Sequence, residues 1–186
     1  MDMKKRISLV LLMLCFCILL SACGGETVET DAPEGCLRAG NEATDFTFCY
    51  PNTWQIDRND GMISVKTNVG ASGTKAYASI SVMAFTLEDK NMGASNFWDK
   101  HKGDLTDTYG NKIAYTEEKK ELTLDGNKAC QSRYSIKLSD VTYQYVQVFC
   151  VRYGQVYLLT LTAPEGTMDG VMNGWETVLE TFAFEN

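Results

Sequence analysis

The chain is predicted to adopt an α+β fold, in which a central antiparallel sheet of about six to eight strands combines with two helices. Three features of the 186 residues lead to this prediction. Much of the sequence from residue 46 onward alternates apolar and polar residues, which is the period of a half-buried strand. Two stretches instead place apolar residues three and four positions apart, which is the period of a helix. Short turns with glycine or asparagine separate several strands and favour antiparallel hairpins.

Four strands are expected in the first half of the fold. They cover residues 46–50, 54–56, 62–67 and 76–86. The sequence Asn59-Asp60-Gly61 separates the second strand from the third, because glycine accepts the positive φ of a tight hairpin. Small residues such as Ala76 and Ala78 share one face of the fourth strand, which predicts close packing on that face.

Each of the two predicted helices carries its apolar residues on one side. The first lies between residues 92 and 109, and its repeating residues are Phe97, Trp98, His101, Leu105 and Tyr109. The second covers residues 168–182 and is followed by a short extended end. Its repeating residues are Met168, Val171, Met172, Trp175, Val178, Leu179 and Phe182.

Four further strands are expected between the helices, at residues 113–124, 129–138, 143–153 and 155–162. The first of them (IAYTEEKKELTL) is charged and predicts an edge or an exposed face. The last two carry large apolar residues at both odd and even positions, so we expect them to be central and covered on both sides.

The N-terminal residues predict export and lipid attachment. Lys4, Lys5 and Arg6 precede an apolar run from Ile7 to Leu20, which is too short for the roughly 20 residues of a spanning helix. The sequence LSAC that ends at Cys23 resembles the lipobox of bacterial lipoproteins, in which the cysteine sulfur takes up diacylglycerol. We therefore expect a signal peptide at 1–22, a flexible acidic tether at 23–44 and a globular domain at 45–186. The mature protein would be anchored to the membrane through Cys23 and face the outside of the cytoplasmic membrane.

The charge balance argues against nucleic acid as a partner. The chain has 17 Lys and Arg against 24 Asp and Glu, a net charge of -7. Removal of residues 1–22 would leave 14 basic and 23 acidic residues, a net charge of -9. Proteins that grip phosphate backbones carry the opposite sign.

Four cysteines remain once the signal peptide and Cys23 are set aside: Cys36, Cys49, Cys130 and Cys150. An even number in an exported protein suggests disulfides, and four cysteines allow three connectivities. A three-residue turn at 139–141 would place Cys130 directly opposite Cys150 on neighbouring strands, and Cys36 would then pair with Cys49. Buried free thiols are the alternative. Zinc binding is disfavoured because the chain has one histidine and no CxxC.

Four segments together resemble a known family: FTFCYPNTWQI, DGNKA, GQVYLLTLTAP and ETFAF. The pattern is similar to the PsbP-like and DcrB-like group, and the resemblance covers residues 45–184. It implies a central antiparallel sheet with helices on both faces, the PsbP-like α/β/α sandwich, and a role in docking onto larger assemblies. The motifs are structural and carry no catalytic residue. The chain departs from the pattern at Thr181, where the family has serine, and in its extra cysteines.

Few residues have the spacing that catalysis or metal binding needs. His101 lies on the apolar side of its predicted helix, which favours a packing role, and no GxSxG motif or second histidine is present. Residues 57–61 favour a hairpin over a calcium loop. An aromatic stripe on one strand could be a binding platform, although core packing under a helix is the more common role of such a stripe. Its residues are Tyr143, Tyr145, Phe149 and Tyr153.

These observations favour a non-enzymatic surface lipoprotein that binds a protein or a small ligand at the cell envelope, with no cofactor. A protein partner in the envelope is expected, besides the membrane itself. The alternatives are a small envelope hydrolase built from acidic residues and a metal-binding module. A hydrolase should show a cleft with convergent carboxylates, whereas a docking domain should offer an exposed surface.

Overall fold

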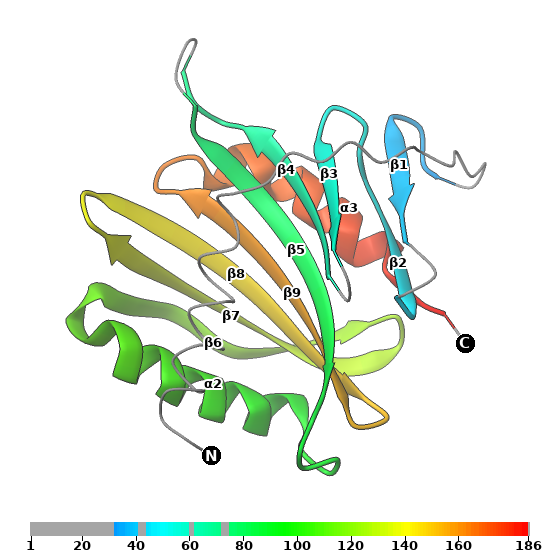
Figure 1. Ribbon diagram of the computed structural model, residues 1–186, viewed down its shortest axis with the longest axis vertical. Coiled ribbons are helices and arrows are strands. Elements are labelled where there is room, and N and C mark those ends of the chain that lie inside the picture. The colour runs from blue at the N-terminus through cyan, green and yellow to red at the C-terminus, as the bar shows by residue number, and fades with distance from the viewer. Residues whose placement is uncertain (1–31, 41–43, 60–61, 72–74, 186) are drawn as a thin grey trace.

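A computed structural model describes residues 32–40, 44–59, 62–71 and 75–185 (Figure 1). Within these ranges, ten strands form a seven-stranded and a three-stranded sheet. Two α-helices, α2 (Ala94–Tyr109) and α3 (Met172–Thr181), pack on opposite sides of the larger sheet. The predicted α+β fold with helices on both faces is therefore confirmed.

The larger sheet is antiparallel throughout, in the order β3-β4-β5-β9-β8-β7-β6. Its strands are β3 (Gln55–Asn59), β4 (Met62–Asn68), β5 (Tyr77–Thr86), β6 (Ile113–Leu124), β7 (Asn127–Leu138), β8 (Val141–Arg152) and β9 (Gln155–Pro164). As expected, the charged strand β6 is an edge, while β8 and β9 are central; β9 is buried along most of its length and β8 through its second half, from Tyr145 to Cys150.

Two meanders make up this sheet. The strands β3, β4 and β5 follow one another in the first meander, and two-residue turns connect β6, β7, β8 and β9 in the second. The chain passes from the first meander to the second through α2 and a short 3-10 helix, η1 (Gly110–Lys112). Pairing of β5 with β9, from Ser79↔Thr162 to Thr86↔Gln155, joins the two meanders into one sheet.

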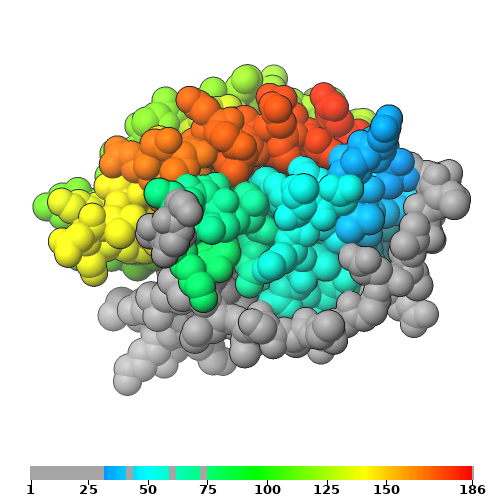
Figure 2. All heavy atoms as spheres, turned by 90° about the horizontal axis from the view of Figure 1, so that it is seen from above, coloured from blue at the N-terminus to red at the C-terminus, as the bar shows by residue number. Residues whose placement is uncertain are grey.

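The two sides of the sheet bury different kinds of residue. On the α3 side the core is largely aliphatic, and α3, the 3-10 helix η2 (Met168–Val171) and the smaller sheet cover it. Figure 2 shows this C-terminal segment, in orange and red, as a layer along one side of the cyan and green strands. On the α2 side aromatic rings make up almost half of the buried apolar residues, and they form a cluster beneath that helix.

The smaller sheet includes residues that the sequence predicted to be part of a flexible tether. It has the order β1-β2-β10 and consists of β1 (Cys36–Ala39), β2 (Phe46–Pro51) and β10 (Ala183–Phe184). Residues 36–39 were expected to belong to a flexible tether, but they pair with β2, Ala39 is fully buried and Leu37 packs against the core. Backbone pairing and two apolar side chains thus order a segment that is polar on average.

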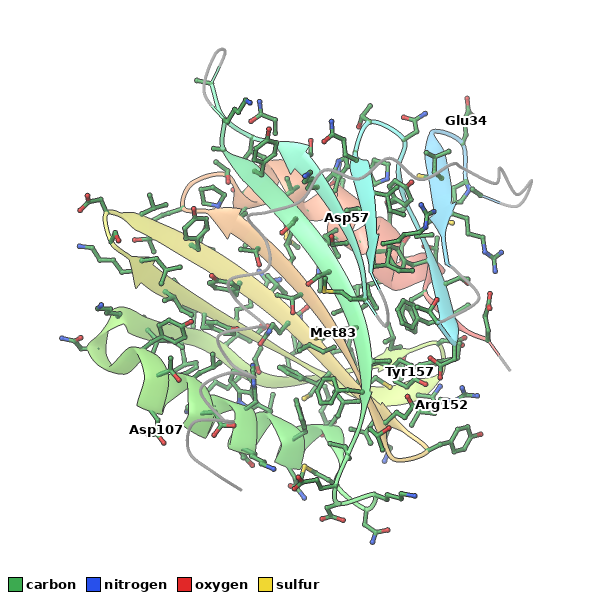
Figure 3. All side chains as sticks on the ribbon, viewed as in Figure 1. Glu34, Asp57, Met83, Asp107, Arg152 and Tyr157 are labelled. Carbon is green, nitrogen blue, oxygen red and sulfur yellow. The ribbon has the colours of Figure 1, made fainter. Side chains whose placement is uncertain are left out.

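Aromatic contacts connect the smaller sheet to the larger one. Tyr157 of β9 donates a hydrogen bond of 2.5 Å to Asp45, just before β2. The ring of Tyr157 also meets Phe184 of β10 edge to face at 4.7 Å. The Arg152 guanidinium lies 4.8 Å from the centroid of the Phe184 ring, and Figure 3 shows Arg152 and Tyr157 near the same end of the sheet.

The tryptophan of the WQI segment packs directly on α3. A Cβ placed on Gly174 would lie 2.8 Å from the nearest ring atom of Trp54, so glycine gives the indole room to approach the helix. Gly103 in the middle of α2 has no such neighbour, because a Cβ placed there would meet nothing within 4 Å outside its own helix backbone.

These two helical glycines should respond to alanine in opposite ways. We expect Gly174→Ala to lower the free energy of unfolding by about 1 to 2 kcal/mol, because overpacking against Trp54 outweighs the gain in helix propensity. We expect Gly103→Ala to raise it by up to about 1 kcal/mol. Urea denaturation of both variants measures this. Equal stabilisation by the two substitutions would contradict the packing of Trp54 on α3.

Candidate functional site

The α2 side of the larger sheet has an aromatic half and a polar half. The helix α2 packs on β6, β7 and β8 (Figure 1). On the described β3, β4, β5 and β9, polar residues point to this same side, and eight of them line up in two rows. We call them the polar face, and they are Gln55, Asp57, Ser64, Lys66, Ser79, Ser81, Thr160 and Thr162.

Strand register arranges the polar face in two rows that run across four strands. One row is Asp57↔Ser64↔Ser81↔Thr160, and the other is Gln55↔Lys66↔Ser79↔Thr162. In β4, β5 and β9 the residues between them point to the opposite side and belong to the aliphatic core. Asp57 and Met83 in Figure 3 lie on β3 and β5 of this side.

Sequence reasoning did not identify the polar face. The signal was present, because Ser79 and Ser81 in one strand and Thr160 and Thr162 in another have the spacing of two that places them on one side of a strand. Only the register of β5 against β9 shows that the two pairs lie next to each other.

A buried chain of hydrogen bonds connects α2 to the polar face. His101 is 5% exposed, and its Nε2 lies 3.2 Å from Oε1 of Gln147 on β8. The amide nitrogen of Gln147 donates to the hydroxyl of Thr160 at 3.0 Å. With the amide in this orientation the imidazole carries its proton on Nε2, and all donors point from α2 towards the polar face.

His101 is held neutral. Burial among the rings of Phe97, Trp98 and Phe149 lowers the pKa of His101 to about 4, against the smaller opposing effect of the bond to Gln147. The packing role expected for this histidine agrees with its position, because its side chain lies under the helix and away from the polar face.

Thr162 is the second buried threonine of the polar face. Its exposed fraction is 7%, and its side chain points to the same side as its register neighbours Ser79 and Tyr145. Its hydroxyl makes no hydrogen bond with any residue in the part of the chain that the structure describes. This hydroxyl can donate a hydrogen bond to a ligand oxygen or accept one from it.

Charged residues of β6 form ion pairs with α2. Glu118 accepts a hydrogen bond of 2.7 Å from Lys102, and Asp99 lies 2.6 Å from Lys119. Two register shifts between Tyr115 and Lys120 interrupt the pairing of β6 with β7 around these residues. Bulges of this kind re-aim side chains at a sheet edge. The charged edge strand therefore makes ion pairs with the helix, in addition to being solvated.

The four residues considered as an aromatic platform do not form one. Tyr145 and Phe149 are buried under α2, and Tyr143 is half-buried. Tyr153 is 87% exposed, but it lies in the turn after β8 with its ring 4.6 Å from the Arg152 guanidinium. Strand alternation ends at Arg152, which separates Tyr153 from the other three residues.

The predicted disulfide between Cys130 and Cys150 is wrong. The β7–β8 turn has two residues between Leu138 and Val141, one fewer than expected, so Cys130 faces Phe149 and Cys150 faces Ala129. A shift of one residue moves a side chain to the other side of the sheet. Cys130 therefore belongs to the aromatic cluster and Cys150 to the aliphatic core.

All four described cysteines are free thiols. Cys36 lies opposite Pro51 and Cys49 opposite Arg38, so the two are diagonal neighbours and not directly opposed. Diagonal Cα atoms are about 7 to 8 Å apart, beyond the usual span of a disulfide. Burial raises the pKa of Cys130 and of Cys150 to about 11, which keeps both thiols protonated and unreactive.

Several predicted features cannot be placed on this structure. The signal peptide 1–22 and the lipidation site Cys23 lie outside the described residues. In the described ranges no helix has the length and apolar character to cross a membrane. No group of three or more His, Cys, Asp or Glu residues that could hold a metal ion occurs in those ranges.

Comparison with solved structures defines the class of fold as PsbP-like. Cyanobacterial PsbP from Synechocystis matches with a TM-score of 0.53 and 16% identity, covering 89% of this chain and 98% of that one. LpqN of Mycobacterium tuberculosis, described as involved in cell envelope biogenesis, matches with a TM-score of 0.55 and 12% identity, covering 81% and 92%.

A protein of unknown function from Pseudomonas aeruginosa, described as a putative regulator, matches with a TM-score of 0.54 and 13% identity, covering 76% of this chain and 91% of that one. No family model and no curated protein sequence matches the chain. At these identities the likeness shows the fold alone, and it agrees with the resemblance to the PsbP-like group found in the sequence.

The neutral state of His101 makes a pH-dependent contribution to stability. The pKa is about 4 in the folded chain and 6.5 without the surrounding structure, so the unfolded chain binds more protons between these values. Stability is present above pH 6.5 and falls as the pH drops towards 4, by up to about 3 kcal/mol. Urea denaturation at several pH values measures this loss.

The matched variant is His101→Gln, which keeps a donor for Gln147 but does not titrate. Its stability should depend less on pH than that of the wild type over the same range. Identical pH profiles for the two proteins would show that His101 is not the group responsible.

Proposed function

We propose that this chain is a membrane-anchored envelope lipoprotein whose folded domain binds a protein or a small ligand through the polar face and catalyses no reaction. The observation that carries the binding role is the polar face itself, eight side chains in two rows beside the region covered by α2. Polar groups fixed on a rigid sheet are suited to recognise a ligand without first having to be ordered.

The chemistry of the described residues supports binding over turnover. The one histidine is buried and neutral, and its ring is engaged by Gln147. Glu117 and Glu118, two acidic residues of β6, are engaged with neighbouring side chains of β7 and α2. The alternative function as a hydrolase would require a convergent pair of carboxylates.

The envelope location is supported by two independent observations. The N-terminal sequence has a basic start, a short apolar run and a lipobox-like end at Cys23. The fold is similar to that of LpqN, which is described as involved in cell envelope biogenesis. We infer that acyl chains on Cys23 hold the domain at the outer side of the cytoplasmic membrane.

Lipidation is tested by Cys23→Ser. We expect the wild-type protein in the membrane fraction with a diacylglycerol-modified Cys23 at its N-terminus, because acyl chains contribute about 0.8 kcal/mol per buried CH₂. The variant should lose the modification and the processing that follows it. Mass spectrometry of the N-terminal peptide is the measurement, and Cys36→Ser is the control that should stay lipidated. A mature N-terminus at another residue would contradict the predicted lipidation of Cys23.

The role of the polar face is tested by Ser81→Arg, which places a long charged side chain in the row Asp57↔Ser64↔Ser81↔Thr160, next to the second row. We expect the variant to fail to complement the phenotype of a strain that lacks the protein. Val141→Arg, at a 44% exposed position at the β7–β8 turn, should complement fully. Thermal midpoints of both variants check their folding. Full complementation by a folded Ser81→Arg protein would show that the function does not need the polar face.

A further inference from the structure

We propose that the polar face binds a neutral saccharide chain. The inference rests on the proposed function, because it names the class of ligand for the same surface. Four features of the described residues support it: the kind of side chain, the charge balance, an exposed tyrosine in line with the rows, and the direction of the hydrogen bonds that end at Thr160.

Short hydroxyl side chains dominate the polar face. Five of its eight residues are serine or threonine, at positions 64, 79, 81, 160 and 162. The exposed positions of β6 in the same sheet carry long charged residues instead, such as Glu118 and Lys120. Hydroxyls both donate and accept hydrogen bonds, as do the hydroxyls of a sugar. Short side chains also let a flat, extended ligand approach the sheet backbone.

The charges of the polar face cancel. Lys66 and Asp57 are its only charged members, in a chain with a net charge of -7. A strongly ionic ligand would have to lose its hydration without a matching cluster of opposite charge. This charge balance favours an uncharged ligand over an acidic polymer or a phosphate.

Tyr77 extends the polar face with an aromatic ring. It precedes Ser79 by two positions and therefore points to the same side of β5. It is 43% exposed, and the Lys66 ammonium lies 5.8 Å from the centroid of its ring. The C–H groups on one side of a pyranose pack well against such a ring, because that side of the sugar is apolar and flat.

Two buried hydroxyls can donate to ligand oxygens. Thr160 accepts its hydrogen bond from Gln147, so its own proton is left to be donated. Thr162 lies two positions further along β9, on the same side, and its hydroxyl makes no hydrogen bond with the described residues. Together with Tyr77 these threonines give a ring platform followed by fixed donors, the combination that an oligosaccharide needs.

The test uses the full chain, purified in a zwitterionic detergent that carries no sugar. Calorimetric titration with neutral hexasaccharides of glucose, mannose and N-acetylglucosamine is the measurement. Hexagalacturonate and a library of unstructured peptides serve as the acidic and the peptide probes. We expect at least one neutral hexasaccharide to bind and both other classes to fail.

Two variants locate the binding. Thr162→Val keeps the shape of the side chain and removes its hydroxyl, and we expect affinity to fall about threefold to tenfold. Tyr77→Ala should lower affinity by about tenfold or more. Tyr153→Ala removes an exposed tyrosine far from the polar face and should bind like the wild type. Thermal midpoints check that all three variants fold. If Tyr77→Ala does not fold, Thr162→Val still tests the site.

The outcomes separate this inference from the proposed function. Absence of binding by every neutral hexasaccharide, or binding that neither variant weakens, overturns the saccharide inference. If acidic saccharides or peptides bind instead and Tyr77→Ala weakens them, the saccharide inference fails while the polar face stands as a binding surface. If no probe binds and Ser81→Arg complements in cells, both proposals fail.

Discussion

Pairing of β5 with β9 is the interaction on which the rest of this structure depends. These strands belong to different meanders, and their ladder of eight pairs makes one sheet out of them. On the α3 side the ladder sets Val82 opposite Leu159 and Ile80 opposite Leu161, in the centre of the aliphatic core. On the other side it sets Ser81 opposite Thr160 and so creates the polar face. One register thus decides both surfaces.

The helix α2 covers only part of its side of the sheet, and this partial cover separates the packed aromatic residues from the polar face. Trp98 and Leu105 are fully buried beneath it, and burial of side chains of this size contributes about 1.5 to 3 kcal/mol each. Its ion pairs with β6 are partly exposed and contribute little individually. We infer that hydrophobic packing holds the helix, while the ion pairs fix its position relative to the edge strand.

His101, Gln147 and Thr160 connect these two regions. The chain of hydrogen bonds satisfies polar groups that would otherwise be buried without partners. It also fixes the orientation of the Thr160 hydroxyl at the border of the polar face. His101, which the sequence assigned to packing, therefore also orients polar groups at the border of a surface that the sequence does not reveal.

Local patterns predicted the elements of the fold well. The order of strands and helices, the charged edge at β6 and the central position of β8 and β9 all follow from periodicity and composition, because each depends on a few neighbouring residues. The packing position of His101 follows from helical spacing in the same way.

The tertiary structure decided the register, the small sheet and the site. One residue of difference in the β7–β8 turn places Cys130 and Cys150 on opposite sides, since neighbouring strand positions point in opposite directions. Strand β1 forms because β2 is available to pair with it, and the polar sequence of this segment does not predict that pairing. The polar face exists because two serines and two threonines, about 80 positions apart in the chain, meet across β5 and β9, and such long-range pairing is fixed by global packing and not by local sequence.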